Sequence, residues 1–233
     1  MGIFADIKED FSNVYKNDPA IHSKLELFIN YPGIWAVASY RVANALYKNN
    51  WKVLSRFIMG VNQIITSIDI HPAATIGSRV FIDHGTGVVI GETSVIEDDV
   101  LIYQGVTLGG VSLTSGKRHP TIKRGAVIGA GAKVLGNITI GVESKVGANS
   151  VVVKEVPDHS TAIGIPARVV DKGRCKDPFS HNKLPDIDKE MFEYLLKRVA
   201  ILEHIIVKEN NEIVEKDLEL EHIYESFIKS MKS

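Results

Sequence analysis

Aliphatic residues recur at six-residue intervals through the middle of the chain, from about residue 68 to residue 170. They are Ile70, Ile76, Ile82, Ile90, Ile96, Ile102, Leu108, Ile122, Ile128, Val134, Ile140, Val146 and Val152. Helices and flat strands have periods of 3.6 and 2.0 residues, so neither explains this spacing. A hexapeptide repeat is typical of a parallel β-helix, in which each unit forms one short strand and a turn. Three units complete a triangular coil, so the aliphatic side chains are expected to stack inside it.

The repeat shifts phase at two places, and both hold polar segments. The first break contains the residues DHGTG, which begin with Asp83 and His84. The second lies between Leu108 and Ile122 and is rich in glycine and serine, with Arg118 and His119 near its end. Loops that leave a rigid solenoid are frequent places for binding and catalysis. We therefore expect these polar residues at defects in the wall and not in its lining.

Helical patterns flank the repeat on both sides. Residues 1–67 carry apolar residues at helical spacing, interrupted by the breakers NDPA and NYPG. After a linker-like segment, helical spacing returns at Phe192, Leu195, Val199, Leu202 and Ile206. We predict an α+β chain with an N-terminal helical domain (1–67), a β-helix (68–172), and a linker with a C-terminal helical extension (173–233). The C-terminal apolar stripe could form a short coiled coil or pack on the body.

The overall composition excludes several classes of protein. The chain has 233 residues, with 27 basic and 28 acidic side chains and a net charge of −1, so we expect no nucleic-acid or membrane partner. Its single cysteine, Cys175, rules out a disulfide framework. The first residues contain acids and no unbroken apolar run, unlike a signal peptide. We expect a cytoplasmic protein.

Several motifs together resemble those of bacterial serine O-acetyltransferases. These are IDIHPA, DHGTG, VTLGG, GKRHPTI and IPARVV, and the likeness extends more weakly to NDPA. The resemblance implies a left-handed β-helix, a homotrimer, and transfer of the acetyl group of acetyl-CoA to the hydroxyl of L-serine. The products are O-acetyl-L-serine and CoA, in the first step of cysteine biosynthesis, and no metal is expected. Pairing of trimers into hexamers stays open.

The proposed chemistry needs a base for the hydroxyl proton, and His84 suits that role because imidazole titrates near neutral pH. A carboxylate on the other ring nitrogen would fix the tautomer and stabilise the imidazolium. Asp69 and Asp83 compete for this role. The resemblance favours Asp69 as the partner of His84 and Asp83 as a ligand of the substrate.

The remaining site residues follow from the substrates. The serine ammonium favours Asp18 and Asp83, and its carboxylate favours the guanidinium of Arg118, while His119 adds a polar contact or supports the oxyanion. Pro19 belongs to the same family pattern as Asp18. In the family the pantetheine arm of acetyl-CoA lies in a groove between neighbouring β-helices. The resemblance then gives four residues for the cofactor: Gly110, Ala130 and Ala148 for backbone contacts, and Lys145 for a phosphate.

Other functions remain possible on the same scaffold. A related acetyltransferase could use another hydroxyl or amine acceptor, such as a sugar. A zinc hydratase could gather His71, His84 and His119, although their spacing fits no zinc motif. A non-catalytic assembly scaffold has no use for polar defects in its wall.

Two expectations concern regulation and partners. L-cysteine differs from L-serine only by sulfur for oxygen, so it can use the same ammonium and carboxylate contacts and act as a feedback inhibitor. Family members often bind O-acetylserine sulfhydrylase through a C-terminal isoleucine. This sequence ends SFIKSMKS, so we expect no tight complex of that kind.

Overall fold

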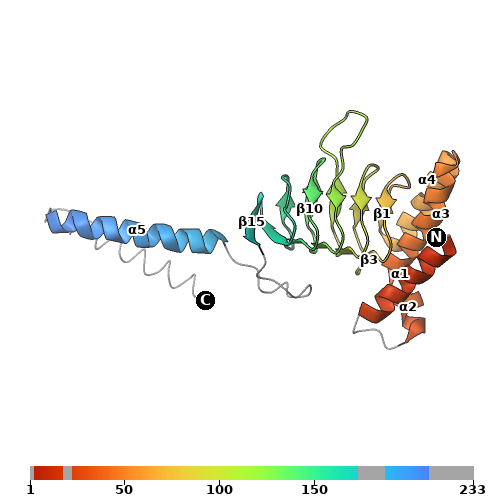
Figure 1. Ribbon diagram of the computed structural model, residues 1–233, viewed down its shortest axis with the longest axis horizontal. Coiled ribbons are helices and arrows are strands. Elements are labelled where there is room, and N and C mark those ends of the chain that lie inside the picture. Colours follow the sequence, from red (N-terminus) through yellow and green to blue (C-terminus); the bar gives the residue numbers. More distant parts are fainter. Residues whose placement is uncertain (1–2, 18–22, 173–186, 210–233) are drawn as a thin grey trace. The chain divides into compact units, whose positions relative to one another are not determined.

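The computed structural model describes residues 3–17, 23–172 and 187–209 of the chain (Figure 1). The chain divides into two compact units, Met1–Leu184 and Pro185–Ser233. The first unit holds the N-terminal helices and all the strands of the described part. The second unit holds one described helix, α5 (Ile187–Glu209).

Four helices precede the strands, as the apolar spacing predicted. They are α1 (Ile3–Asn17), α2 (Lys24–Asn30), α3 (Pro32–Lys48) and α4 (Lys52–Thr66). Ser23 begins α2 with a capping box, since its hydroxyl accepts from the Glu26 N–H while the Glu26 carboxylate accepts from the Ser23 N–H. Pro32 occupies the first turn of α3, where its missing N–H costs no helical hydrogen bond. These local signals explain why α2 begins after Ser23 and why α3 begins at the breaker NYPG.

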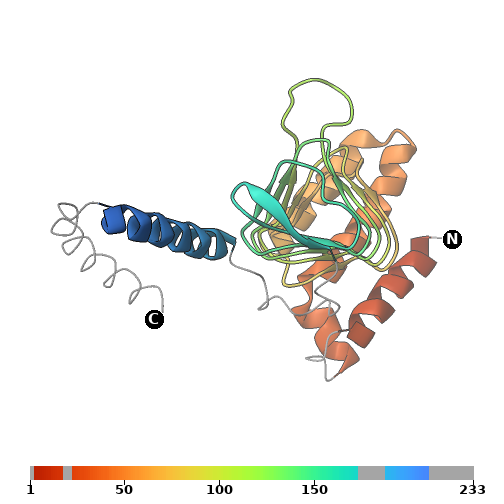
Figure 2. The same ribbon diagram turned by 60° about the vertical axis from the view of Figure 1, so that its left-hand side comes forward.

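Fifteen short strands follow α4 and wind into a coil. They are β1 (Asp69–Ile70), β2 (Thr75–Ile76), β3 (Phe81–Ile82), β4 (Val89–Ile90), β5 (Val95–Ile96), β6 (Leu101–Ile102), β7 (Thr107–Gly109), β8 (Thr121–Ile122), β9 (Val127–Ile128), β10 (Lys133–Leu135), β11 (Thr139–Ile140), β12 (Lys145–Val146), β13 (Val151–Val152), β14 (Ser160–Gly164) and β15 (Ala167–Lys172). As far as β13, every third strand pairs in parallel, and β14 then joins β12 and β15 joins β14. This gives three sheets in the orders β1-β4-β7-β10-β13, β2-β5-β8-β11 and β3-β6-β9-β12-β14-β15. We refer to these as the first, second and third sheets. Figure 2 shows the stacked coils with a roughly triangular outline. The antiparallel pair β14 and β15 closes the last coil.

The repeated aliphatic residues line the inside of the coil. All thirteen positions predicted from the six-residue period are buried, and the most accessible of them, Ile76, is only 6% exposed. Each is stacked on its counterpart in the next coil, as in the ladder of Ile82, Ile102, Ile128 and Val146. Burial of this ladder supplies the main favourable contribution to folding. The predicted parallel β-helix is therefore confirmed.

The two phase breaks insert residues into single coils without disturbing the stack. Asp69 pairs with Val89, twenty residues later, whereas Val89 pairs with Thr107, eighteen residues later. The first break thus adds two residues at the corner between β3 and β4. Val95 pairs with Thr121, twenty-six residues later. The second break adds eight residues, which form the loop that projects between β7 and β8 (Figure 1).

Helices α1 to α4 lie at the β1 end of the coil (Figure 1). Buried polar contacts join them to the first coil. Arg41 of α3 donates to both Asp10 of α1, at 3.0 Å, and the carbonyl of Ile76, at 2.8 Å. Asp10 also accepts from the Arg79 N–H at 2.9 Å. One ion pair therefore ties two helices to the first coil. None of the described helices is long and apolar enough to cross a membrane.

Candidate active site

His84 stands at the corner between β3 and β4. Its backbone is left-handed, with φ of +57°, and Gly85 and Gly87 in the same turn also have positive φ. The side chain is 75% exposed, and its Nε2 lies 3.9 Å from Oδ1 of Asp83. The inserted residues therefore lift an imidazole out of the wall, where a substrate could reach it.

The two competing carboxylates lie on different sides of this corner. Asp83 follows β3 directly, its N–H donates to the Ile102 carbonyl at 2.8 Å, and its side chain is 21% exposed. Asp69 begins β1, and its N–H donates at 2.9 Å to the carbonyl of Val88, at the far end of the same turn. Both residues are described, and no ion pair within 4.0 Å joins His84 to Asp69. Which carboxylate orients the imidazole stays a prediction.

On the later coils, the turns that follow the third sheet carry small or polar side chains at the corner where His84 lies. Backbone hydrogen bonds set the register at this corner, because each coil donates to a carbonyl of the coil before it, at Thr86, Gln104 and Ala130. Thr86, Gln104, Ala130 and Ala148 therefore occupy equivalent positions on four successive coils, and His84 lies in the two-residue insertion that precedes Thr86. We call these four residues, together with the inserted His84, the His84 column. Two of the residues predicted to contact acetyl-CoA, Ala130 and Ala148, therefore lie at the same corner as the predicted base.

Arg118 lies at a different corner, between β4 and β5. Its Nη2 donates to Oε2 of Glu92 at 2.6 Å, which orients the guanidinium. This hydrogen bond lowers the pKa of the Glu92 carboxyl, which favours its charged form. The sequence patterns did not single out Glu92, because its partner is 26 residues away across the projecting loop. Its position two residues after the buried Ile90, at the corner to which that loop returns, is the signal that could have revealed it.

His119 is held at the same corner and is only 8% exposed. Its Nδ1 lies 2.9 Å from Oγ1 of Thr93 and 3.2 Å from the Thr93 nitrogen. Burial and the neighbouring Arg118 cation lower the pKa of His119, so the ring is neutral around pH 7. Gly110 borders both loop residues, because a Cβ added there would lie 3.1 Å from Cγ of Arg118 and 3.2 Å from Nε2 of His119. Gly110 is thus placed beside the two residues predicted to bind serine, away from the His84 column.

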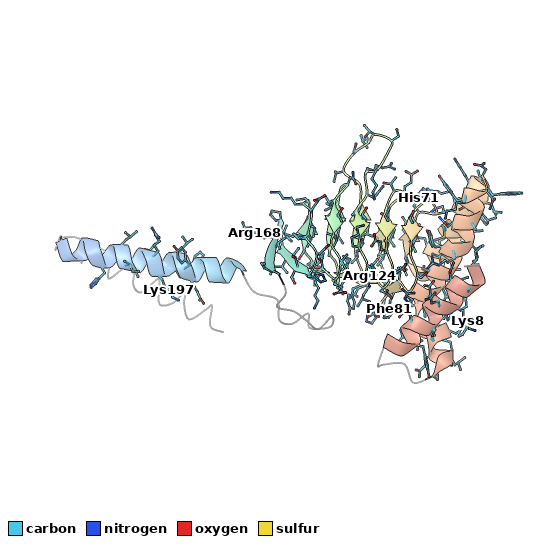
Figure 3. All side chains as sticks on the ribbon, viewed as in Figure 1. Lys8, His71, Phe81, Arg124, Arg168 and Lys197 are labelled. Atoms are coloured by element: carbon cyan, nitrogen blue, oxygen red, sulfur yellow. The ribbon has the colours of Figure 1, made fainter. Side chains whose placement is uncertain are left out.

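His71 follows β1 in the first coil, near the helices (Figure 3). Its ring packs edge-on against Tyr47 of α3, with 5.9 Å between centroids, and its Nδ1 accepts from the Ala73 N–H. Burial lowers the pKa of this imidazole, with a smaller contribution from Arg56. These contacts suit a packing role. Among the described residues, no group of three or more histidine, cysteine or acidic side chains is placed to hold a metal ion, so the zinc alternative gains no support.

Three predicted site residues remain: Lys145, Asp18 and Pro19. Lys145 begins β12, on the coil that carries Ala148. Asp18 and Pro19 lie outside the described residues. The structure therefore forms two clusters in one chain, the His84 column with its carboxylates at one corner and Arg118 with His119 at the next, separated by the first sheet.

Comparisons with known proteins show which sequences and folds this chain resembles. No family model matches the chain. The serine acetyltransferase of Bacillus pumilus (strain SAFR-032) is 49% identical over 201 residues, which cover 85% of this chain and 93% of that protein. A solved serine acetyltransferase in complex with cysteine is 44% identical, covers 78% of this chain and 72% of its own, and has a TM-score of 0.74. Another, in complex with CoA, is 46% identical, covers 72% of this chain and 70% of its own, and has a TM-score of 0.69.

These likenesses extend over both the coil and most of the helical region. They also give the hand of the coil, which the hexapeptide spacing alone left undetermined. The fold is the left-handed β-helix of these enzymes. The chain belongs to the serine acetyltransferase family.

Proposed function

We propose that this protein transfers the acetyl group of acetyl-CoA to the hydroxyl of L-serine, giving O-acetyl-L-serine and CoA. The likeness to serine acetyltransferases over most of the chain carries this proposal. The CoA-bound relative supports acetyl-CoA as the co-substrate. The reaction is the first step of cysteine biosynthesis, and we place the enzyme in the cytoplasm.

The chemistry can be followed atom by atom on the proposed residues. His84 accepts the hydroxyl proton while the serine oxygen bonds to the thioester carbonyl carbon. The tetrahedral oxyanion then collapses, the carbon–sulfur bond breaks, and the departing CoA sulfur takes the proton from the imidazolium. Asp69 orients the imidazole and stabilises its charge, while Asp83 and Asp18 bind the serine ammonium, with Pro19 beside them. Arg118 and His119 bind the carboxylate end.

The acyl donor is proposed to lie along the His84 column. Ala130 is half-buried and Ala148 is exposed, so small side chains leave room for a linear pantetheine arm close to the backbone. Gly110 and Lys145 complete the proposed contacts, the lysine towards a phosphate. This direction of approach brings the thioester to the coil that carries His84.

Release of CoA with L-serine as acceptor tests the function. We expect turnover with L-serine and acetyl-CoA that exceeds turnover with sugar acceptors by several orders of magnitude. Turnover that prefers a sugar would replace serine with another acceptor on the same fold. Absence of CoA release with every acceptor would refute an acetyltransferase.

The proposed assembly is a homotrimer. Within one chain the His84 corner and the Arg118 corner are separated by the first sheet. A threefold arrangement can set the first corner of one chain against the second corner of its neighbour, which would complete three equal sites. Exposed apolar residues of α4, among them Val53, Phe57 and Ile64, offer a further surface for association. The mass in solution distinguishes a monomer, a trimer and a pair of trimers.

Cysteine is proposed to compete with serine for the same contacts. A related enzyme is solved with cysteine bound, and cysteine shares the ammonium and carboxylate of serine. We expect Arg118→Ala to raise the Michaelis constant for serine and the inhibition constant for cysteine together, each by about tenfold or more. Steady-state inhibition kinetics check this. Cysteine inhibition that keeps its wild-type strength in the variant would indicate a separate regulatory site.

A further inference from the structure

Thr93 contacts three consecutive residues where the projecting loop returns to the coil. Its hydroxyl oxygen accepts from the backbone N–H of Arg118 at 3.0 Å and from that of His119 at 3.1 Å. Its carbonyl accepts from Nζ of Lys117 at 2.7 Å. One residue of the preceding coil therefore holds the end of the loop that carries two of the proposed serine contacts.

A count of protons at this junction fixes the state of the His119 ring. A threonine hydroxyl has one hydrogen to donate and two lone pairs, and here both lone pairs are occupied by backbone N–H groups. The hydroxyl hydrogen is then available for Nδ1 of His119, 2.9 Å away. The Thr93 N–H also donates to Nδ1, at 3.2 Å, and an amide N–H can only donate. With donors directed at Nδ1, the neutral ring carries its proton on Nε2.

The protonated nitrogen lies against two glycines. A Cβ added to Gly91 would lie 2.1 Å from Nε2 of His119, and one added to Gly110 would lie 3.2 Å from it. The absence of side chains at these positions leaves the space in which the ring sits. The ring therefore presents Nε2–H as a donor in one orientation, at the same corner as the guanidinium of Arg118.

We propose that Thr93 is a positioning residue for acetyl transfer, which keeps His119 in the Nε2–H tautomer and holds the Arg118–His119 segment in register. Thr93 itself touches no reacting atom. It acts through His119, whose Nε2–H donates to an oxygen of the bound acceptor. This inference rests on the proposed function, since the acceptor is taken to be L-serine.

Three variants test the positioning role by steady-state kinetics. Thr93→Val keeps the shape but removes the hydroxyl, Thr93→Ser keeps the hydroxyl, and Thr139→Val removes a hydroxyl from another half-buried repeat position in β11. We expect Thr93→Val to lower kcat/KM for serine by about ten- to hundredfold, with the KM for acetyl-CoA within about twofold of wild type. Thr93→Ser should recover activity to within a few-fold, and Thr139→Val should match wild type. Unchanged serine kinetics in Thr93→Val, or an equal loss in Thr93→Ser, would overturn the proposal.

The tautomer has a readout that does not depend on activity. Nitrogen-15 NMR of the histidine-labelled wild-type enzyme near pH 8 distinguishes a protonated ring nitrogen from an unprotonated one, and His119→Gln assigns the signal. We expect protonated Nε2 and unprotonated Nδ1. Protonated Nδ1 would overturn the proposal even in an active enzyme. Failure to acetylate serine, with the Nε2–H tautomer in place, would instead count against the proposed function.

Discussion

The backbone of His84 bears on how its role can be tested. A left-handed φ of +57° is uncommon for residues other than glycine, and asparagine is among the few that adopt it at low cost. The side chain is largely exposed, so few packing contacts depend on it. Replacement by asparagine therefore removes the imidazole while keeping the turn.

We expect His84→Asn to lower kcat by at least about two orders of magnitude, the usual contribution of a positioned general base. The thermal unfolding midpoint should stay close to that of wild type, because the residue lies at a corner outside the core. Both quantities are measurable on the purified enzyme. Near-normal turnover in the folded variant would exclude His84 from the mechanism.

Substitutions of Asp69 and Asp83 should change different kinetic constants. If Asp69 orients the imidazole, Asp69→Asn lowers kcat and leaves the KM for serine nearly unchanged. If Asp83 binds the ammonium, Asp83→Asn raises the KM for serine by about tenfold or more, the cost of a lost charge-assisted hydrogen bond. Asp83 lies 3.9 Å from the His84 ring, so an exchange of the two roles, with Asp83 orienting the imidazole, also has a physical basis. A fall in kcat confined to Asp83→Asn would exchange the two roles.

Among the elements, the turns after the third sheet form the proposed wall for acetyl-CoA. Ala148 is exposed at the last position of the His84 column, three coils from the base. We expect Ala148→Phe to raise the KM for acetyl-CoA by about tenfold, because a bulky ring blocks close approach to the backbone, while the KM for serine stays unchanged. Val153→Phe, at an exposed position after β13 in a different column, is the matched control. Equal KM values for acetyl-CoA in both variants would place the donor elsewhere.

The elements also show which features of the fold and of the candidate site can be predicted from the sequence. The six-residue period predicted thirteen rungs of the core, from Ile70 to Val152, because each coil must bury one aliphatic residue per side. It missed the last two rungs, Val156 and Ala162, which continue two of the ladders out of that period. DHGTG and RHP indicated the candidate site, because they interrupt that period. Glu92 and Thr93 keep the period and were missed, although each bonds a loop residue 25 or 26 positions later. Such partners are set by the stacking of coils and by the size of the loop, which local spacing does not encode.

At the scale of the whole molecule, a single chain separates the proposed base from the proposed carboxylate contacts. His84 lies at the corner between β3 and β4, whereas Arg118 bonds Glu92 at the corner between β4 and β5. A site that needs both residues must therefore form between chains if the enzyme is the proposed trimer. Each site would then take His84 from one chain and Arg118 from its neighbour.

Mixed trimers test this arrangement. At a serine concentration well below KM, His84→Asn and Arg118→Ala should each lose most of the wild-type activity when assayed alone. A site that takes Arg118 from the first variant and His84 from the second has both wild-type residues. Random reassembly of equal amounts should restore about one quarter of the wild-type activity, since about one site in four then has intact partners in a cyclic trimer. Differently tagged chains, co-expressed and purified through both tags, verify the mixing, and this selected fraction should reach about one third of the wild-type activity, because each mixed trimer holds one intact site among three. Mixed trimers that stay as inactive as the parents would show that both residues act within one chain, which would require the Arg118 loop to reach across the first sheet.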